Sequence, residues 1–213
     1  MKTNRFIAVL LILLGSTALS QTAHAKTLLV LGDSLSAAYG IQTEQGWVTL
    51  LEKQLLQSGK VDKVINASIS GETTDGGLRS LPGLLKKHSP AVVIIELGAN
   101  DGLRGFPINI IERNLARLVE LAQHYQSKVL LVGMHIPPNY GKRYANAFHQ
   151  LYPKIAEQYN TALLPFMLKD IAIHPKLMQE DKLHPKAEAQ ESIKELIWEQ
   201  LEALLKDTSF IAG

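Results

Sequence analysis

The stretch LLVLGDSLSAAYG, residues 28–40, joins an apolar run directly to a group of polar side chains. The run ends at Gly32, and Asp33, Ser34 and Ser36 follow at once. An almost continuous aliphatic run is typical of a strand that is buried on both faces of a parallel sheet. Such a strand delivers the next residues to the carboxyl edge of the sheet, where open α/β folds bind ligands. The polar group therefore indicates either an ordinary turn or a reactive hydroxyl.

Five apolar segments have the length and composition of strands. They are residues 27–31, 63–67, 91–97, 128–134 and 161–164. Stripes with the three-four spacing of amphipathic helices begin at Trp47, Ile111, Tyr144 and Ile193, and Pro153 interrupts the third of them. That proline either kinks its helix or starts a new one. Strands that alternate with helices predict a doubly wound α/β domain with a parallel sheet.

The first 25 residues have the layout of a secretory signal peptide. A basic start precedes an apolar run over residues 6–14, and small residues end at Ala25. The apolar run is shorter than the roughly 20 residues that span a membrane, so we expect no stable membrane anchor. We predict cleavage after Ala25, a mature domain over residues 26–213, and a periplasmic or secreted location.

Composition excludes several classes of function. The 213-residue chain has 22 basic and 20 acidic residues, and without the two basic residues of the leader the charges balance. No basic cluster indicates a nucleic-acid partner. The chain has no cysteine, which excludes thiol catalysis and cysteine-ligated zinc. We expect a monomer.

Polar residues also stand where the other predicted strands end. Gly71 lies in NASISG after the second strand, and Asn100 lies in GAND after the third. Asp181 and His184 form an Asp-x-x-His unit before the last helical stripe. Because the carboxyl ends of parallel strands meet at one edge of the sheet, the sequence predicts that these side chains share a site with Ser34.

The Asp-x-x-His unit supplies a base with an orienting carboxylate. Residues three apart on a tight turn can face each other, and Pro185 suits the first position of the helix that follows. The carboxylate fixes the imidazole tautomer and stabilises the imidazolium, and a serine hydroxyl needs such a base to become a nucleophile. The resulting oxyanion needs preorganised donors, each contributing about 2.7–4 kcal/mol. The candidates are the amides of Ser34 and Gly71 and the side chain of Asn100.

These motifs resemble the GDSL, or SGNH, hydrolases. Gly32-Asp33-Ser34-Leu35-Ser36 resembles the first block of that family, Gly71 the glycine of the second, GAND the third, and Asp181-x-x-His184 the fifth. The surrounding segments NASISGETT, GANDGLRG and IPPNYGKRY resemble a bacterial periplasmic branch with multifunctional acyl-CoA thioesterases, lysophospholipases and arylesterases. Ala99 departs from the pattern, because many relatives have a second glycine there.

The resemblance implies a three-layer α/β/α domain around a flavodoxin-like, five-stranded parallel sheet. It implies a serine hydrolase without cofactor or metal, with Ser34 as nucleophile, His184 as base and Asp181 as its orienter. Ser34, Gly71 and Asn100 would form the oxyanion hole. The implied substrates are small acyl esters and thioesters, including lysophospholipids.

Other residues near these motifs have simpler expected roles. The apolar Leu103 and Phe106 lie just after Asn100, and we expect them to cover an acyl chain. Asp33 fits a turn or supporting residue, and Glu96, if it is buried, must tie segments together through hydrogen bonds. His135 follows the fourth predicted strand and borders the expected site, where a structural role is favoured.

Three alternative functions are weighed against this one. A carbohydrate O-acetylesterase would share the same four blocks, and a preference for acetyl esters would reveal it. A non-catalytic lipid- or glycan-binding module could descend from the same fold, but here all five functional positions are present. A nucleotide-binding protein is disfavoured, since the chain has neither a Gly-x-Gly-x-x-Gly nor a Gly-Lys-Ser/Thr loop.

Overall fold

The centre of the protein is a parallel sheet whose five strands have the order β2-β1-β3-β4-β5. The computed structural model describes residues 26–206. The strands are β1 (Thr27–Gly32), β2 (Lys63–Asn66), β3 (Val92–Glu96), β4 (Lys128–Val132) and β5 (Ala162–Leu164). This is the flavodoxin-like order, so the predicted sheet is confirmed, with every strand boundary within two residues of its expected position.

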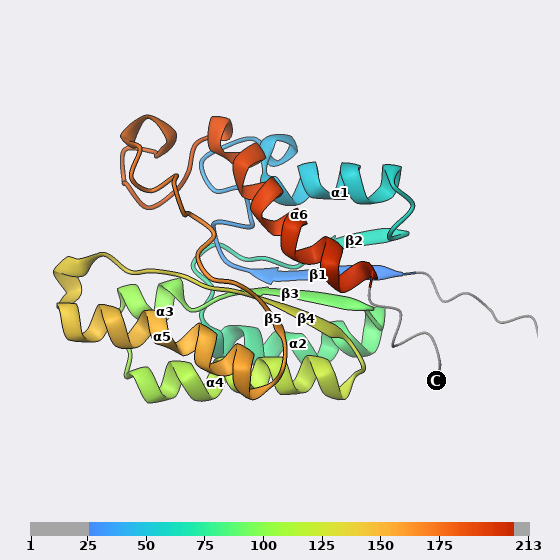
Figure 1. Ribbon diagram of the computed structural model, residues 1–213, viewed down its shortest axis with the longest axis horizontal. Coiled ribbons are helices and arrows are strands. Elements are labelled where there is room, and N and C mark those ends of the chain that lie inside the picture. Colours follow the sequence, from blue (N-terminus) through green and yellow to red (C-terminus); the bar gives the residue numbers. More distant parts are fainter. Residues whose placement is uncertain (1–25, 207–213) are drawn as a thin grey trace, which may run out of the picture.

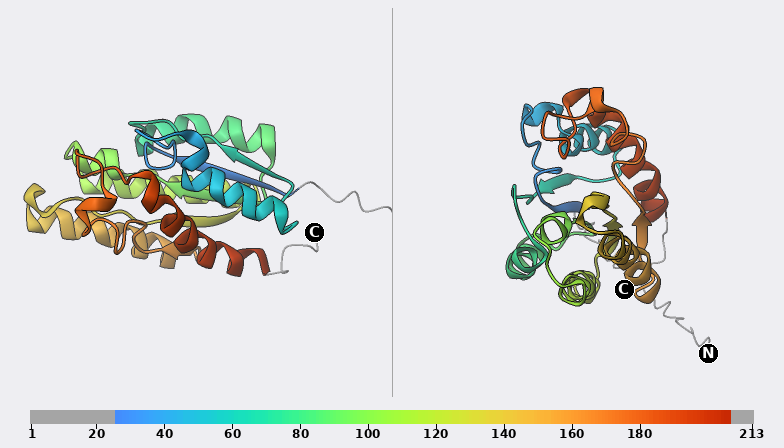
Figure 2. Two further views of the ribbon diagram at one scale, coloured as in Figure 1. Left: turned by 90° about the horizontal axis from the view of Figure 1, so that it is seen from above. Right: turned by 90° about the vertical axis from the view of Figure 1, so that its left-hand side faces the viewer.

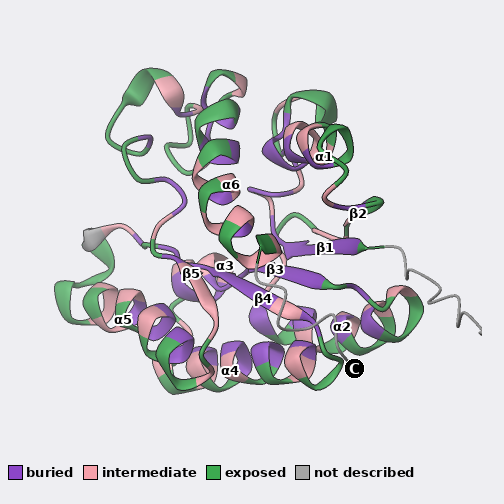
Figure 3. Ribbon diagram, turned by 45° about the vertical axis from the view of Figure 1, so that its right-hand side comes forward, coloured by how far each residue is buried: buried purple, intermediate pink, exposed green. Residues whose placement is uncertain are grey.

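The middle of the sheet is buried on both faces. Every residue of β1 and β3 is buried, as are the last four residues of β4 (Figure 3). The register places Leu29 beside Val93, and Val93 beside Val129. Each buried aliphatic side chain contributes about 1.5–3 kcal/mol. Burial on both faces is the reason for the nearly unbroken aliphatic runs in the sequence.

Helices cover both faces of the sheet and complete three layers. They are α1 (Trp47–Gln57), α2 (Thr74–His88), α3 (Ala99–Leu103), α4 (Ile108–His124), α5 (Lys142–Gln158) and α6 (Gln190–Lys206). Figures 1 and 2 show α1 and α6 together on one face, with α2, α4 and α5 on the other. The three-layer α/β/α prediction is confirmed.

Helix α2 has no counterpart among the predicted stripes. Its residues include Gly76, Gly77, Pro82 and Gly83, which weaken an isolated helix. Gly77 is required by packing, since a Cβ added there would lie 2.5 Å from Leu97 Cδ1. Close contact between this helix and the sheet stabilises α2 where intrinsic propensity does not.

Two prolines do not end or begin helices where the sequence suggested. Pro153 lies inside the continuous helix α5 and does not split it. Pro185 was expected to start the last helix, but α6 begins at Gln190, after a short 3-10 turn (Ala187–Ala189). Pro185 instead forms an isolated antiparallel bridge with Met178, which fixes the loop that precedes α6.

The predicted signal peptide, residues 1–25, lies outside the described residues. Between residues 26 and 206, no helix combines the length and the apolar character needed to cross a bilayer. The carboxyl ends of the strands point toward the long loop between β5 and α6 and the turn after β1 (Figure 1). The predicted site residues lie at this edge.

Candidate active site

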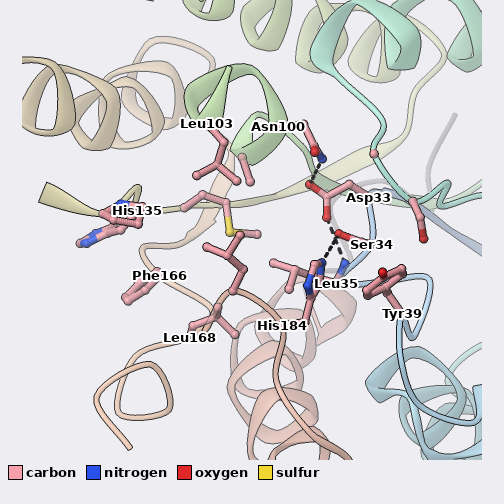
Figure 4. Close-up of a pocket in the computed structure, with 16 residues that line it drawn as sticks. Asp33, Ser34, Leu35, Tyr39, Asn100, Leu103, His135, Phe166, Leu168 and His184 are labelled. Carbon is pink, nitrogen blue, oxygen red and sulfur yellow. Dashed lines mark hydrogen bonds between the residues drawn. The ribbon is translucent and has the colours of Figure 1, made fainter. Parts of the chain in front are cut away.

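A pocket of about 340 Å³ opens at the carboxyl edge of the sheet. Its walls come from the segments after all five strands and from the loop before α6 (Figure 4). Ser34, Gly71, Asn100 and His184 all line it. The structure thus brings these four residues, which are far apart in the sequence, into one cavity.

Ser34 lies just beyond β1, from which Asp33 separates it. The segment 34–40 forms consecutive turns and not the helix that often follows such a strand. The amide of Ala37 donates to the Asp33 carbonyl at 3.0 Å, and the amide of Tyr39 donates to the Ser34 carbonyl at 3.1 Å. These bonds fix the backbone around Ser34, whose half-buried side chain faces the pocket.

Ser34, His184 and Asp181 form an unbroken chain of hydrogen bonds. Ser34 Oγ lies 2.8 Å from His184 Nε2, and His184 Nδ1 lies 2.7 Å from Asp181 Oδ2. With the Nδ1–H donating to the carboxylate, Nε2 is left with a lone pair that can accept the serine proton. The arrangement has the geometry of a nucleophile, a base and an orienting carboxylate.

The loop before α6 holds the carboxylate of Asp181 against His184. Asp181 Oδ1 accepts hydrogen bonds from the backbone amides of Leu183 at 2.9 Å and His184 at 3.0 Å. Lys182, between Asp181 and Leu183, adopts a left-handed φ of 58°, which allows the tight turn. Burial raises the pKa of Asp181, but the hydrogen bonds from His184 and Leu183 outweigh burial and hold the pKa below its usual value. Asp181 is therefore an anion at neutral pH.

Gly71 and Asn100 line the pocket together with Ser34, and Figure 4 shows Asn100 on the opposite side of Ser34 from His184. Gly71 has a φ of 80°, a conformation that favours glycine. Arg104 donates to the Gly71 carbonyl at 3.0 Å. Asn100 Nδ2 donates one hydrogen bond to Asp33 Oδ2 at 3.0 Å, and its second N–H can serve a ligand. With the Ser34 amide, these groups supply donors for a developing oxyanion.

A second polar system lies next to Ser34, between the end of β3 and the turn after β1, and we call its two carboxyls, Asp33 and Glu96, the buried acid pair. Glu96 Oε2 accepts from the Ser36 hydroxyl at 2.6 Å and from the Asp33 amide at 3.2 Å. Asp33 Oδ1 accepts from the Leu35 amide at 3.0 Å. Glu96 thus joins β3 to the turn after β1, as expected for a buried residue of this type.

The buried acid pair has unusual protonation. Burial raises the pKa of Asp33 to about 6, against hydrogen bonds from Leu35 and Asn100 and the charge of His184. Burial and the neighbouring charge of Asp33 raise the pKa of Glu96 well above its ordinary value. Glu96 Oε1 is buried without a partner among the described residues. We therefore assign Glu96 as a neutral acid and Asp33 as the charged member at neutral pH.

The two apolar residues expected near an acyl chain have different places. Leu103 lines the pocket, in the company of Met134 and Leu168. Phe106 does not line it, because its partly buried side chain packs against the core and its carbonyl accepts from Tyr144 Oη at 2.6 Å. The short helix α3 ends at Leu103, before Phe106.

Sequence reasoning missed other residues of the pocket wall. Tyr39 and Leu183 line it beside His184, and the ring centroids of Tyr39 and His184 lie 4.6 Å apart. Phe166 lines it from the segment after β5. An aromatic or aliphatic residue in a loop carries no periodic signal, so only the general rule that strand ends form sites pointed to these positions.

The sequence and the fold both match known esterases and thioesterases. Residues 30–191 match the GDSL-like Lipase/Acylhydrolase family. Esterase TesA of Pseudomonas aeruginosa is 49% identical over 187 residues, which cover 88% of this chain and 93% of that protein. The arylesterase of Vibrio mimicus is 48% identical over 177 residues, with 83% and 88% covered.

A third relative and a solved structure extend the likeness. The Escherichia coli protein named thioesterase 1/protease 1/lysophospholipase L1 is 41% identical over 189 residues, which cover 89% of each chain. A crystal structure of TesA superposes with a TM-score of 0.81 at 49% identity and covers 84% of this chain and 99% of that one. With a family match over most of its length, this chain belongs to the GDSL-like lipase/acylhydrolase family.

Proposed function

We propose that this esterase and thioesterase works through an acyl-enzyme on Ser34, with His184 as the general base and acid and Asp181 as its orienter. The observation that carries the proposal is the unbroken hydrogen-bond chain from Asp181 through His184 to Ser34, at the floor of an open pocket. Relatives named esterase, arylesterase and thioesterase support ester and thioester substrates.

The geometry supports a two-step reaction. His184 Nε2 takes the Ser34 proton while Oγ attacks the acyl carbon, and the carbonyl oxygen becomes an oxyanion. The imidazolium then gives its proton to the leaving alcohol or thiol, which departs and leaves the acyl group on Oγ. Water, deprotonated by His184, hydrolyses that ester and restores Ser34.

The oxyanion faces the donors opposite the base. These donors are the amides of Ser34 and Gly71 and the free N–H of Asn100. Arg104 and Asp33 hold the last two in place through their hydrogen bonds. All the donors are fixed before substrate arrives, so they can stabilise the transition state without reorganisation.

The leaving group and the acyl group occupy different sides of the pocket in this proposal. The leaving group must lie near His184, which protonates it, and hence near Tyr39. The acyl group then extends along the apolar wall of Leu103, Met134 and Leu168 (Figure 4). This wall favours aliphatic acyl esters, thioesters and lysophospholipids over the acetylated carbohydrates of an O-acetylesterase.

Hydrolysis of p-nitrophenyl esters from acetyl to palmitoyl tests the assignment. Protein that begins at Lys26 should turn over the series, and Ser34→Ala should fall to background. Ser80→Ala, on α2, is a matched control that should keep full activity. Retained activity in Ser34→Ala would overturn the nucleophile, and hydrolysis of acetyl esters alone would favour the O-acetylesterase.

The location of the protein is part of the proposal. Residues 1–25 resemble a signal peptide, so we place the mature enzyme, from Lys26, in the periplasm or outside the cell. N-terminal sequencing of protein from the exported fraction should begin at Lys26. A sequence that begins at Met1 would contradict the proposed cleavage.

A further inference from the structure

The pocket ends, on the side away from Ser34, at a pair of histidines that the proposed mechanism does not use. His135 follows β4 and lines the pocket, while His149 lies on α5. Figure 4 shows His135 and Phe166 on one side of the cavity, and Ser34 and His184 on the other. The acyl group that extends from Ser34 is therefore directed toward His135.

Aromatic rings on two different elements hold His135 in place. Its ring stacks on Phe166 with the centroids 4.1 Å apart and the planes 13° from parallel. The ring of His149 meets it edge to face at a centroid distance of 3.7 Å. His135 thus has a fixed position at the wall, although it remains accessible to solvent. When the His135 ring is protonated, its positive charge therefore lies at a fixed position in the pocket wall.

The ring of His149 lies close enough to affect the protonation of His135. A positive charge on one ring at this distance opposes a positive charge on the other. The buried Nδ1 of His149 has no hydrogen-bond partner among residues 26–206, whereas His135 is exposed to solvent. Partial burial and the charge of His149 lower the pKa of His135.

Other charged groups near the pair leave His135 unaffected. On α5, Lys142 and Arg143 lie in the first turn, and Lys154 is paired with Glu112. The segment with Phe166 carries the exposed Lys169 and Asp170. Among the described residues only His149 shifts the pKa of His135 through its charge. The other ionisable groups of the pocket lining, Asp33, Tyr39 and His184, lie at the end of the pocket near Ser34.

We propose that His135, held between His149 and Phe166, determines specificity for the distal end of the acyl group. Neutral His135 completes an apolar wall with Phe166 and accepts an aliphatic chain end. Protonated His135 places one positive charge there, which disfavours an apolar end and binds an anionic one, such as the free carboxylate of a dicarboxylic acid monoester. This inference rests on the proposed function, because it requires an acyl group on Ser34.

Matched substrate pairs separate this charge from that of the catalytic base. We would measure kcat/KM for p-nitrophenyl hexanoate and octanoate and for the corresponding monoesters of adipic and suberic acid, across pH 5 to 8. Changes in ionisation at the reacting end affect both members of a pair equally and cancel in their ratio. The preference for the carboxylate ester should rise about three- to fivefold as the pH falls, with its midpoint below the usual histidine pKa of 6.5.

Two variants and a control locate the charge. His135→Asn should make the ratio independent of pH, because no group at the wall then titrates. His149→Asn should shift the midpoint to higher pH, since it removes a charge that opposes protonation of His135. His124→Asn, at the far end of α4, should leave the ratio unchanged. NMR titration of the His135 ring gives the same midpoint without turnover.

Each remaining outcome overturns one assignment. A flat ratio in the wild type, with hydrolysis that still depends on Ser34, would refute the specificity role and leave the proposed function intact. A pH dependence that survives His135→Asn would also refute the role of His135. Hydrolysis that survives Ser34→Ala would instead refute the proposed function, whatever the ratio does.

Discussion

Two aspartates lie near Ser34, and the protein places them in opposite surroundings. The Asp181 side chain is 39% exposed, and hydrogen bonds hold its pKa low. Asp33 is 1% exposed, and burial raises its pKa to about 6. Asp181 is hydrogen-bonded to His184, and Asp33 accepts a hydrogen bond from Asn100, so both aspartates contact residues that line the pocket with Ser34.

The difference shows that burial and hydrogen-bond partners, and not residue type, determine how each aspartate is ionised. Asp181 can keep its charge at little cost because water and three donors surround it. Asp33 keeps a charge under the pocket because Glu96 beside it stays neutral and because Asn100 and Leu35 donate to it. In the proposed mechanism the exposed acid orients His184, whereas the buried acid pair positions Asn100.

The largest loss of activity is expected from substitutions of the exposed Asp181 and its partner His184. His184→Ala should lower kcat/KM by about 10⁴-fold or more, because Ser34 loses its base. Asp181→Asn should cost about 10³–10⁴-fold, since the imidazole loses its tautomer and its counter-charge. Steady-state kinetics on p-nitrophenyl acetate would measure both. The double variant should be no worse than His184→Ala, and multiplied losses would contradict a shared pathway.

The next effect concerns the link between the buried acid pair and the oxyanion. Asn100→Ala should lower kcat by about 10²–10³-fold with little change in KM, because the lost donor acts in the transition state. Asp33→Asn should cost less than Asn100→Ala. In the Asn100→Ala background it should add almost nothing, since Asp33 acts through Asn100. Independent, multiplicative losses in that double-mutant cycle would break the link.

The third effect is on stability and tests whether Glu96 is neutral. Its raised pKa means that the folded state retains a proton that the unfolded state releases above pH 4.5. Stability from this group is complete below that pH and is lost as the pH rises, by about 1.4 kcal/mol per pH unit. Glu96→Gln removes this loss. The free energy of unfolding of the variant, relative to that of the wild type, should therefore increase between about pH 5 and 7.

Urea unfolding at several pH values would measure that gain. Glu199→Gln, an exposed residue on α6, is the control and should follow the wild type at every pH. Parallel curves for Glu96→Gln and the wild type would mean that Glu96 is ionised in the folded protein, which would remove the proposed contrast with Asp33.

The smallest effect should have the opposite sign. The pKa of Asp181 is lowered, so its contribution to stability is present above the unfolded value of 3.8 and is lost as the pH falls through the folded value. Because the side chain is substantially exposed, the contribution should be under about 1 kcal/mol. Asp181→Asn should be slightly less stable than the wild type at pH 7, and the two should converge in acid. A larger gap at low pH would contradict the sign.

Local signals in the sequence were sufficient for the sheet and for the residues that the structure brings together around Ser34. Ser34 follows an apolar run, and Asp181 and His184 are only three residues apart. Neighbouring residues in the sequence are therefore enough to identify them as candidates. Helix α2 was missed because its glycines hide the stripe, although the Thr73 cap and the basic last turn were available as signals. Its stability comes from contact with Leu97, which no local pattern contains.

The properties that depend on depth or on distant partners could not be predicted. The protonation of Asp33 and Glu96 depends on their complete burial, which cannot be predicted from the amino-acid sequence alone. The meeting of His135 with His149 joins a strand end to a helix. Phe106 was expected to cover an acyl chain because it follows Asn100 closely, whereas in the structure its side chain packs against the core.

The hydrogen bond between Ser34 and His184 spans 150 positions of the chain. Ser34 leaves the ribosome early, whereas His184 arrives only after all five strands have been made. In the proposed mechanism, a nascent or truncated chain that lacks the loop before α6 therefore carries an inert hydroxyl. Gln179 fastens that loop to the first turn, with its Nε2 donating to the Tyr39 carbonyl at 2.8 Å. The onset of ester hydrolysis during refolding therefore times the docking of this last segment.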